Sequence, residues 1–267
     1  MTRPEPLAHR IDGTGETVLL LNGGMMTIAS WDAIAAPLAA HYRVVRCDFR
    51  GQLRSPGPHH PDLAGHVQDL VRLLDELGVR RAHAVGTSFG AEVALLLAAS
   101  HPDRVASLVA GTATDIATPL LQDGSAELRQ ELRGAAAGGN RDRLLTILHN
   151  LFYSPAYVAT HGRELSERAA QVALLPDWWF AGAADLLAAL ENFDLRRYLG
   201  GITCPVLVLA AGEDRVMPPE RARALASAIP AARLEVVEGS GHALVVEQPE
   251  RFVEICLEFL AGVQRYE

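Results

Sequence analysis

The chain has 267 residues, of which 49% are hydrophobic and 21% are charged; this balance supplies a large apolar core and excludes a disordered chain. Its net charge of −8 and the absence of a basic stripe argue against nucleic-acid binding. All 24 basic residues are arginine, which excludes a Schiff-base lysine, a pyridoxal phosphate anchor and a P-loop lysine.

The cysteines and the first residues bear on the compartment. Cys47, Cys204 and Cys256 are scattered and suit neither a disulfide framework nor a metal-binding pair, so we expect buried free thiols in a reducing compartment. Residues 1–10 lack the apolar segment of a signal peptide, and the longest apolar stretch, residues 93–99, is too short to span a bilayer. We therefore expect a cytoplasmic protein with no membrane partner; its oligomeric state stays open.

Short apolar runs alternate with helical patterns along most of the chain. The runs predict buried strands at residues 17–21, 42–46, 81–85, 105–110, 205–210 and 234–237. The helical patterns between and after them cover residues 31–40, 63–77, 90–100, 219–228 and 249–260. This alternation predicts an α/β protein whose central sheet is mostly parallel and carries helices on both faces.

Residues 115–200 break the alternation, because they contain no strand-like run. Helical patterns fill the segment at residues 126–133, 141–151, 164–174 and 181–191. We interpret it as a helical cap on a core made of residues 1–114 and 201–267. Ligands of open α/β sheets bind at the carboxyl ends of the strands, so a cap there would roof a pocket.

Residues 86–90 (GTSFG) form the most specific motif, G-x-S-x-G, between a predicted strand and a predicted helix. Such a turn presents the Ser88 hydroxyl at the positive end of a helix, and Gly86 and Gly90 leave room for the strained backbone. Glycine and serine are common in loops, so the motif by itself could be an ordinary turn. Its strand-to-helix setting favours a nucleophile.

An activated serine needs a base and an acid that orients the base. Asp214 and His242 each follow a predicted strand, and the order Ser88, Asp214, His242 is that of the α/β hydrolases. Glu213 and Asp115 are alternative acids. Composition alone would make His242 one loop histidine among ten, but its position after a strand favours the role of base.

These motifs resemble the α/β-hydrolase superfamily over nearly the whole chain. Residues 22–24 (NGG) stand where many members have His-Gly-x, and residues 48–55 (DFRGQLRS) resemble D-x-R-G-x-G-x-S with Leu53 in place of a glycine. Residues 249–252 (PERF) resemble the start of the final family helix. The branch that looks closest, on residues 49–51 and 152–155, contains serine carboxylesterases and 3-oxoadipate enol-lactonases.

The resemblance implies a cap inserted after the sixth strand and an oxyanion hole made by the backbone N–H groups of Gly24 and Phe89. It implies no metal and no cofactor. Asn22 departs from the commoner histidine, which leaves the local hydrogen bonding open. The substrate pocket is expected to include Met25, Phe152, Trp178 and Trp179, although the cap aromatics could equally serve packing.

The expected function is hydrolysis of a small-molecule carboxylic ester or lactone through an acyl-enzyme on Ser88. The same triad could instead serve C–C bond hydrolysis, thioester cleavage or cofactor-free perhydrolysis, or the fold could be a ligand-binding module without catalysis. His59, His60, Asp62 and His66 could form a metal site, but we interpret them as part of a solvated loop. His149 and His161 are expected at the surface or in packing.

Overall fold

The computed structural model describes residues 5–57 and 59–264. Their strands form one sheet of seven in the order β1-β3-β2-β4-β5-β6-β7, and only β1 is antiparallel to its neighbour. The fold class expected from the sequence is therefore confirmed. The strands are β1 (His9–Asp12), β2 (Thr17–Leu21), β3 (Arg43–Cys47), β4 (Ala82–Thr87), β5 (Val105–Gly111), β6 (Val206–Ala211) and β7 (Arg233–Val237).

Two helical layers cover this sheet and explain why its strands are apolar on both faces. Val18 and Leu20 face the layer of α1 and α12, whereas Leu19 and Leu21 face the layer of α2, α3 and α10. The helix bounds are α1 (Asp32–Ala39), α2 (Leu63–Glu76), α3 (Phe89–Ser100), α10 (Pro219–Ala228), α11 (Leu244–Glu247) and α12 (Pro249–Gln264). Short helical turns cover Ile28–Trp31, Pro102–Arg104 and Leu120–Gly124.

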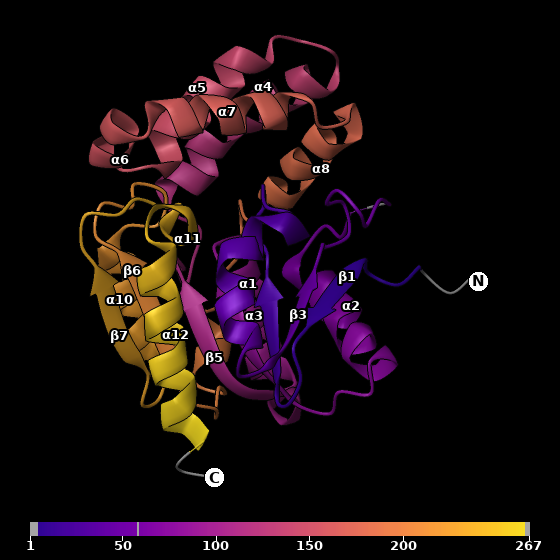
Figure 1. Ribbon diagram of the computed structural model, residues 1–267, viewed down its shortest axis with the longest axis vertical. Helices are drawn as coiled ribbons and strands as arrows, with labels where there is room; N and C mark the ends of the chain where they lie inside the picture. The colour runs from indigo at the N-terminus through magenta and orange to yellow at the C-terminus, as the bar shows by residue number, and fades with distance from the viewer. Residues whose placement is uncertain (1–4, 58, 265–267) are drawn as a thin grey trace.

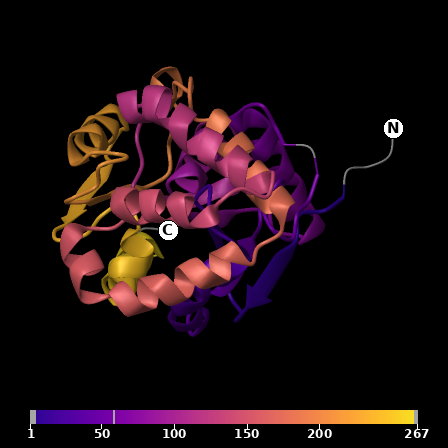
Figure 2. The same ribbon diagram turned by 90° about the horizontal axis from the view of Figure 1, so that it is seen from above.

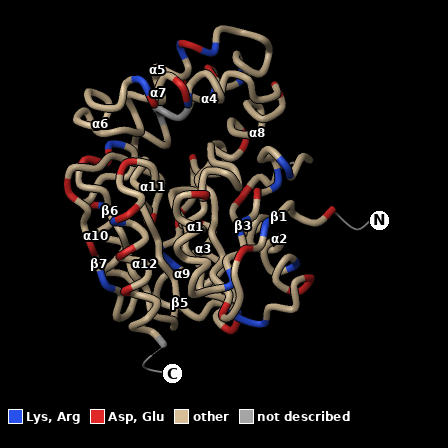
Figure 3. The backbone as a smooth tube through the Cα atoms, viewed as in Figure 1, with Lys and Arg blue, Asp and Glu red and all other residues tan. Residues whose placement is uncertain are grey.

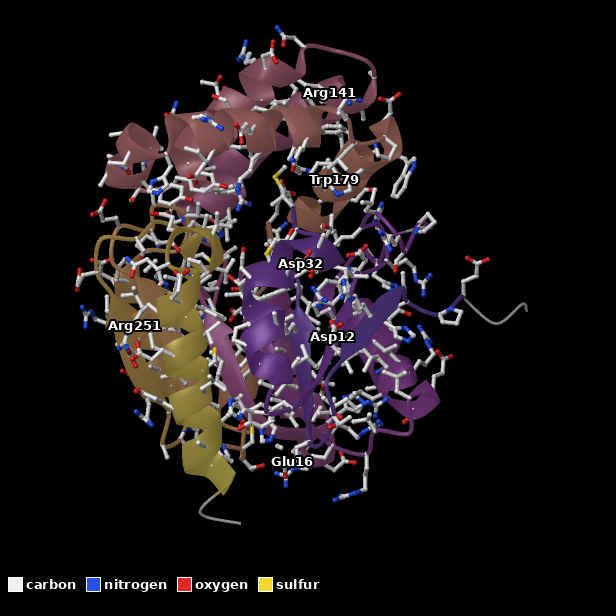
Figure 4. The ribbon with its side chains drawn as sticks, in the orientation of Figure 1. Asp12, Glu16, Asp32, Arg141, Trp179 and Arg251 are labelled. Atoms are coloured by element: carbon white, nitrogen blue, oxygen red, sulfur yellow. The ribbon has the colours of Figure 1, made fainter. Side chains whose placement is uncertain are left out.

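The edge strand β1 was not predicted, because its four residues HRID carry no apolar run. A buried cation holds it in place. The Arg46 guanidinium on β3 pairs with Asp12 of β1 and with Asp32 of α1, each at 2.5 Å. Both aspartates are labelled in Figure 4. Hydrogen bonding from Arg46 is the main cause that lowers the pKa of Asp12. A pairing between residues 34 positions apart in the sequence is invisible to periodicity.

Between β5 and β6 the chain forms a layer of helices at one end of the sheet (Figures 1 and 2). These helices have an apolar core of their own, which includes Leu132, Leu144 and Phe180. Five strands precede the layer in the described chain, not the six implied by the resemblance, since a single short strand lies ahead of β2. The bounds are α4 (Ser125–Ala136), α5 (Arg141–Phe152), α6 (Pro155–Thr160), α7 (Gly162–Ala173), α8 (Asp177–Ala188) and α9 (Arg196–Leu199).

Helix α8 makes a close contact with the core. A Cβ atom at Gly182 would lie only 2.2 Å from the backbone oxygen of Gly51, so glycine is required for this approach. Within the described chain, no helix has both the length and the apolar character needed to cross a membrane.

We expect Gly182→Ala to lower the free energy of unfolding by about 1–3 kcal/mol, because the obstructing atom belongs to the backbone and cannot rotate away. Gly134→Ala on α4 is the matched control: nothing lies within 4 Å of its Cβ position, and alanine should stabilise that helix by about 0.5–1 kcal/mol. Urea unfolding measures both. Equal effects of the two substitutions would contradict the close contact at Gly182.

Candidate active site

Ser88 lies in the tight turn between β4 and α3, with φ 51° and ψ −128°. Such a backbone conformation is strained for a residue with a side chain and persists only where its surroundings enforce it. A Cβ at Gly86 would lie 2.6 Å from the carbonyl carbon of Gly90, and one at Gly90 would lie 2.3 Å from the oxygen of Leu21. Both glycines of the motif are therefore needed for steric reasons.

The structure brings Ser88, His242 and Asp214 into one chain of hydrogen bonds. His242 Nε2 lies 3.0 Å from Ser88 Oγ, and His242 Nδ1 lies 2.8 Å from Asp214 Oδ2. The other oxygen of Asp214 accepts from the backbone N–H groups of Val216 and Met217 at 2.8 and 2.9 Å. In this arrangement the imidazole can accept the serine proton while the buried carboxylate orients the ring.

The two alternative acids lie elsewhere. Glu213 is exposed, and Asp115 forms an ion pair with Arg221 of α10. Neither carboxylate has a hydrogen bond to His242 among the described residues. The acid that reaches the imidazole is Asp214.

Residues 22–24 face the first turn of α3, where a Cβ at Gly24 would lie 4.0 Å from Cβ of Phe89. Asn22, at the position of the commoner histidine, is fully buried and uses its whole amide. Its oxygen accepts from Trp31 Nε1 at 2.7 Å, and its nitrogen donates to Asp48 at 3.0 Å and to Gln52 at 2.9 Å.

Gln52, which the sequence did not single out, completes this network. Its Nε2 donates to the Gly23 carbonyl at 2.8 Å, and its Oε1 accepts from the Phe49 N–H at 2.9 Å. The loop that carries Gly24 is therefore held by buried side-chain amides. This fixes the position of its backbone N–H groups relative to Ser88 without involving a histidine.

The loop that carries His242 is bonded to the cap segment by Glu247, another residue that the sequence did not single out. Glu247 Oε1 accepts from the N–H groups of Gly241 at 2.9 Å and Ser154 at 3.1 Å, and Oε2 accepts from Ser154 Oγ at 2.6 Å. The N–H of Ala243 donates to the carbonyl of Phe152 at 2.8 Å. The Glu247 carboxylate thus links the segment that follows α5 to the loop of His242.

We expect Glu247→Ala to reduce the free energy of unfolding by about 1–3 kcal/mol, because it leaves two backbone N–H groups without their acceptor. Hydrogen exchange at Gly241 and Ser154 should accelerate beyond the change expected from global stability. Glu250→Ala, at an exposed glutamate in the first turn of α12, is the control; it should reduce stability by less than about 1 kcal/mol and leave exchange at Gly241 and Ser154 unchanged beyond that. Unaltered exchange at Gly241 in the Glu247 variant would contradict the role of this contact.

A buried carboxyl group, that of Glu92 on α3, lies behind the site. Its Oε1 accepts from the Thr114 N–H at 3.0 Å, and its Oε2 has no partner among the described residues. Burial raises the pKa of Glu92 well above its usual value, and the nearby charge of Asp214 raises it further. Burial therefore favours the neutral form of this carboxyl group, which lies near the carboxylate of Asp214.

A cavity of about 510 Å³ opens onto Ser88 and His242 between the cap helices and the core. Met25, Phe152 and Trp179 line it as expected, and Leu53 adds an apolar wall at the position of a family glycine. Trp178 does not line it and is 42% exposed, contrary to the expectation. Successive residues on a helix point about 100° apart, and on α8 this turns Trp179 toward the cavity and Trp178 toward solvent. Trp179 is labelled on α8 in Figure 4.

The other five histidines considered in the sequence analysis have no hydrogen bond to Ser88 or Asp214 among the described residues. His59 pairs with Asp185 of α8 at 3.2 Å, His60 with Asp69 at 2.8 Å, and His66 is completely buried. The expectation that these histidines lie in a solvated loop is therefore partly wrong, since His59 and His60 are half-buried and His66 is buried. Asp62 instead caps α2 by accepting from the Gly65 N–H. His149 lines the cavity and packs on Tyr153, and His161 stacks on Tyr157.

His66 predicts an acid-dependent loss of stability. Neither ring nitrogen has a hydrogen-bond partner among the described residues, and burial lowers the pKa of His66 to about 3. Between pH 6.5 and about 3 the unfolded chain binds the proton that the folded chain excludes, so this residue's contribution to stability falls as pH decreases. The slope should approach about 1.4 kcal/mol per pH unit.

Urea unfolding between pH 4 and 7 measures that slope. His66→Leu should remove this part of the pH dependence and leave the part that comes from acidic residues. An identical slope in both proteins would show that His66 takes up a proton in the folded state.

The fold and the hydrogen-bonded serine, histidine and aspartate define a protein of the α/β-hydrolase class. A family model described as "alpha/beta hydrolase fold" matches residues 16–249, and the chain belongs to this family. The chain is 31% identical to the "Putative carbamate hydrolase RutD" of Caulobacter sp. (strain K31), over 96% of each chain. The protein is a hydrolase.

Two solved structures extend the comparison. The α/β hydrolase MGS-M2 from a Medee basin deep-sea metagenome library has a TM-score of 0.89 at 27% identity, covering 96% of this chain and 94% of that one. The enol-lactonase from Burkholderia xenovorans LB400 has a TM-score of 0.84 at 26% identity, covering 96% of each chain. The resemblance to the branch that contains lactonases thus agrees with the structural neighbours.

Proposed function

We propose that the protein is a serine hydrolase that cleaves a carboxylic ester or lactone of a small molecule through an acyl-enzyme on Ser88. The observation that carries the proposal is the chain of hydrogen bonds from Asp214 through His242 to Ser88, at the wall of a cavity of about 510 Å³. A volume of this size suits a small organic substrate. Residues 115–200 would act as the cap that encloses it over the core of residues 1–114 and 201–267.

The first half of the reaction acylates the serine. His242 Nε2 takes the proton from Ser88 Oγ, which attacks the carbonyl carbon, and the π electrons move onto the carbonyl oxygen. The backbone N–H groups of Gly24 and Phe89 would stabilise the resulting oxyanion. When the intermediate collapses, the C–O bond to the leaving group breaks, and the leaving alcohol takes the proton from His242.

The second half releases the acid. Water gives a proton to His242 and attacks the acyl carbon, and the new intermediate collapses with Ser88 as the leaving group. Ser88 regains its proton from the imidazolium, which Asp214 stabilises throughout. The balance is ester plus water to acid plus alcohol, and the residues alone supply every proton transfer.

Carbamate hydrolysis is the second candidate, and the identity with a relative named for that activity over 96% of each chain favours it. A carbamate carbonyl would follow the same steps at Ser88. The walls contain many leucines, among them Leu121, Leu145 and Leu148, and this apolar lining favours a substrate with an apolar group over a small polar carbamate. We therefore place the ester or lactone first.

The proposal predicts that a small fluorophosphonate adds once to the wild-type protein, at Ser88, and not to Ser88→Ala. Intact mass measures the adduct. Turnover of a reactive ester should fall on the order of 10⁶-fold in the variant. Ser30→Ala is the matched control, since Ser30 also lines the cavity but has no hydrogen bond to His242 in the described structure.

The proposal would be contradicted if Ser30 were labelled instead of Ser88. It would also be contradicted if the folded wild-type protein were not labelled under conditions that label a control hydrolase. Esters, lactones and carbamates compared at equal concentration then separate the two candidates. A carbamate cleaved faster than every ester and lactone would reverse their order.

A further inference from the structure

The cavity is mostly apolar, and apart from Thr27 and Ser30 its polar lining residues gather at two places. One polar place contains Ser88 and His242. The other lies on the cap side, where α5 and the residue after it contribute His149 and Tyr153, and α7 contributes Arg168 and Gln171. Among the described residues that line the cavity, Arg168 is the one with a permanent charge.

Arg168 differs from the other arginines of α4, α5 and α7, which are neutralised by carboxylates. Arg168 lines the cavity and is also exposed to solvent, and it forms no ion pair and no hydrogen bond with the described residues. Each of the five other arginines of these helices pairs with a carboxylate: Arg129 with Glu191, Arg133 with Asp185, Arg141 with Asp177, Arg143 with Glu131 and Arg163 with Glu167. Acidic and basic positions are interspersed over the cap in Figure 3. A cation left unpaired among so many carboxylates is available to a ligand.

Two acidic groups lie near enough to this corner to compete for the guanidinium. Glu247 is occupied by the N–H groups of Gly241 and Ser154 and by the Ser154 hydroxyl. Glu164 lies one turn before Arg168 on α7 and is exposed, and it forms no ion pair with Arg168. The positive charge of Arg168 is therefore not cancelled by a fixed partner.

Neutral donors accompany the charge. The ring of Tyr153 stacks on Tyr157 at 5.5 Å and packs against His149 at 5.9 Å, which fixes the phenol in the cavity wall. Burial raises the pKa of Tyr153, and the charge of the nearby Arg168 guanidinium opposes part of this rise. Gln171 follows Arg168 by three residues and so shares its face of α7.

A guanidinium with a phenol and an amide beside it suits a carboxylate, which accepts two parallel hydrogen bonds from arginine. An anion that enters an apolar cavity loses water, and the net charge of −8 repels it at long range. A local cation is what would offset both costs. Neutral esters need no such group.

We propose that Arg168, assisted by Tyr153 and Gln171, forms a subsite for a carboxylate on the substrate. The preferred substrates are then esters that carry a free carboxylate, such as half-esters of dicarboxylic acids. The inference rests on the proposed function, because it assumes that Ser88 attacks the ester at the other polar place in the cavity.

The test compares monoethyl adipate with diethyl adipate, which differ at one end only. The wild-type protein should have the higher kcat/KM for the half-ester. Arg168→Gln should lower that value about 10- to 100-fold, mainly through KM, and change the diester by less than about threefold. Arg168→Lys should restore part of the loss, and added salt should shrink the preference of the wild type.

Arg163→Gln is the matched control. Arg163 lies on the same helix, its side chain is 91% exposed and paired with Glu167, and it does not line the cavity. This variant should behave as the wild type with both esters. Binding of monoethyl adipate to Ser88→Ala, measured by calorimetry, adds a readout that needs no turnover, and Arg168→Gln in that background should weaken it by the same factor.

The outcomes separate the two proposals. If Ser88 is labelled and the diester is cleaved but Arg168→Gln leaves the half-ester unaffected, or lowers both esters equally, the subsite is overturned and the proposed function stands. If Ser88 is not labelled and neither ester is cleaved, the proposed function fails. Unchanged calorimetric binding on loss of Arg168 would then overturn the carboxylate site as well.

Discussion

The close approach of the turn after β4 to the end of β2 is the contact on which the rest of the site depends. Gly90 packs so tightly on Leu21 that no side chain fits, and this approach sets Ser88 in its strained conformation. It also places the first turn of α3 against residues 22–24. Ser88 and the candidate oxyanion donors thus share one junction of the sheet, which helices cover on both faces.

Buried polar networks then position the parts that the sheet cannot. Asn22 and Gln52 hold the loop of Gly24 by side-chain amides, and Asp214 uses both carboxylate oxygens, one toward backbone N–H groups and one toward His242. Every such group is costly to bury unless it is bonded, so each network favours one arrangement of its loop. The catalytic geometry is therefore a consequence of satisfying buried hydrogen bonds.

The cap takes part in this positioning and in the shape of the cavity. Glu247 accepts hydrogen bonds from Ser154, which follows α5, and from Gly241 in the loop of His242, so that it holds the two segments together. Gly182 brings α8 against Gly51 on the opposite part of the core. With both contacts made, the apolar walls and the polar corner at Arg168 lie over the serine as one enclosure.

The sequence by itself determined the alternation of strands and helices, and with it the residues that follow the carboxyl ends of the strands. Ser88, Asp214 and His242 could be selected on that basis, since parallel strands bring those ends to one edge of the sheet. Periodicity also found the cap helices. It could not find β1, whose position depends on the pairing of Arg46 with distant aspartates.

Only the tertiary structure decided which tryptophan faces the cavity and which polar residues support the loops. Glu247, Gln52 and Glu92 carry no motif, because their partners lie up to 93 residues away in the chain. The unpaired state of Arg168 likewise does not follow from the sequence, since its sequence neighbours include glutamates that could have paired with it. Local pattern specifies elements and their order; long-range contacts specify how side chains meet.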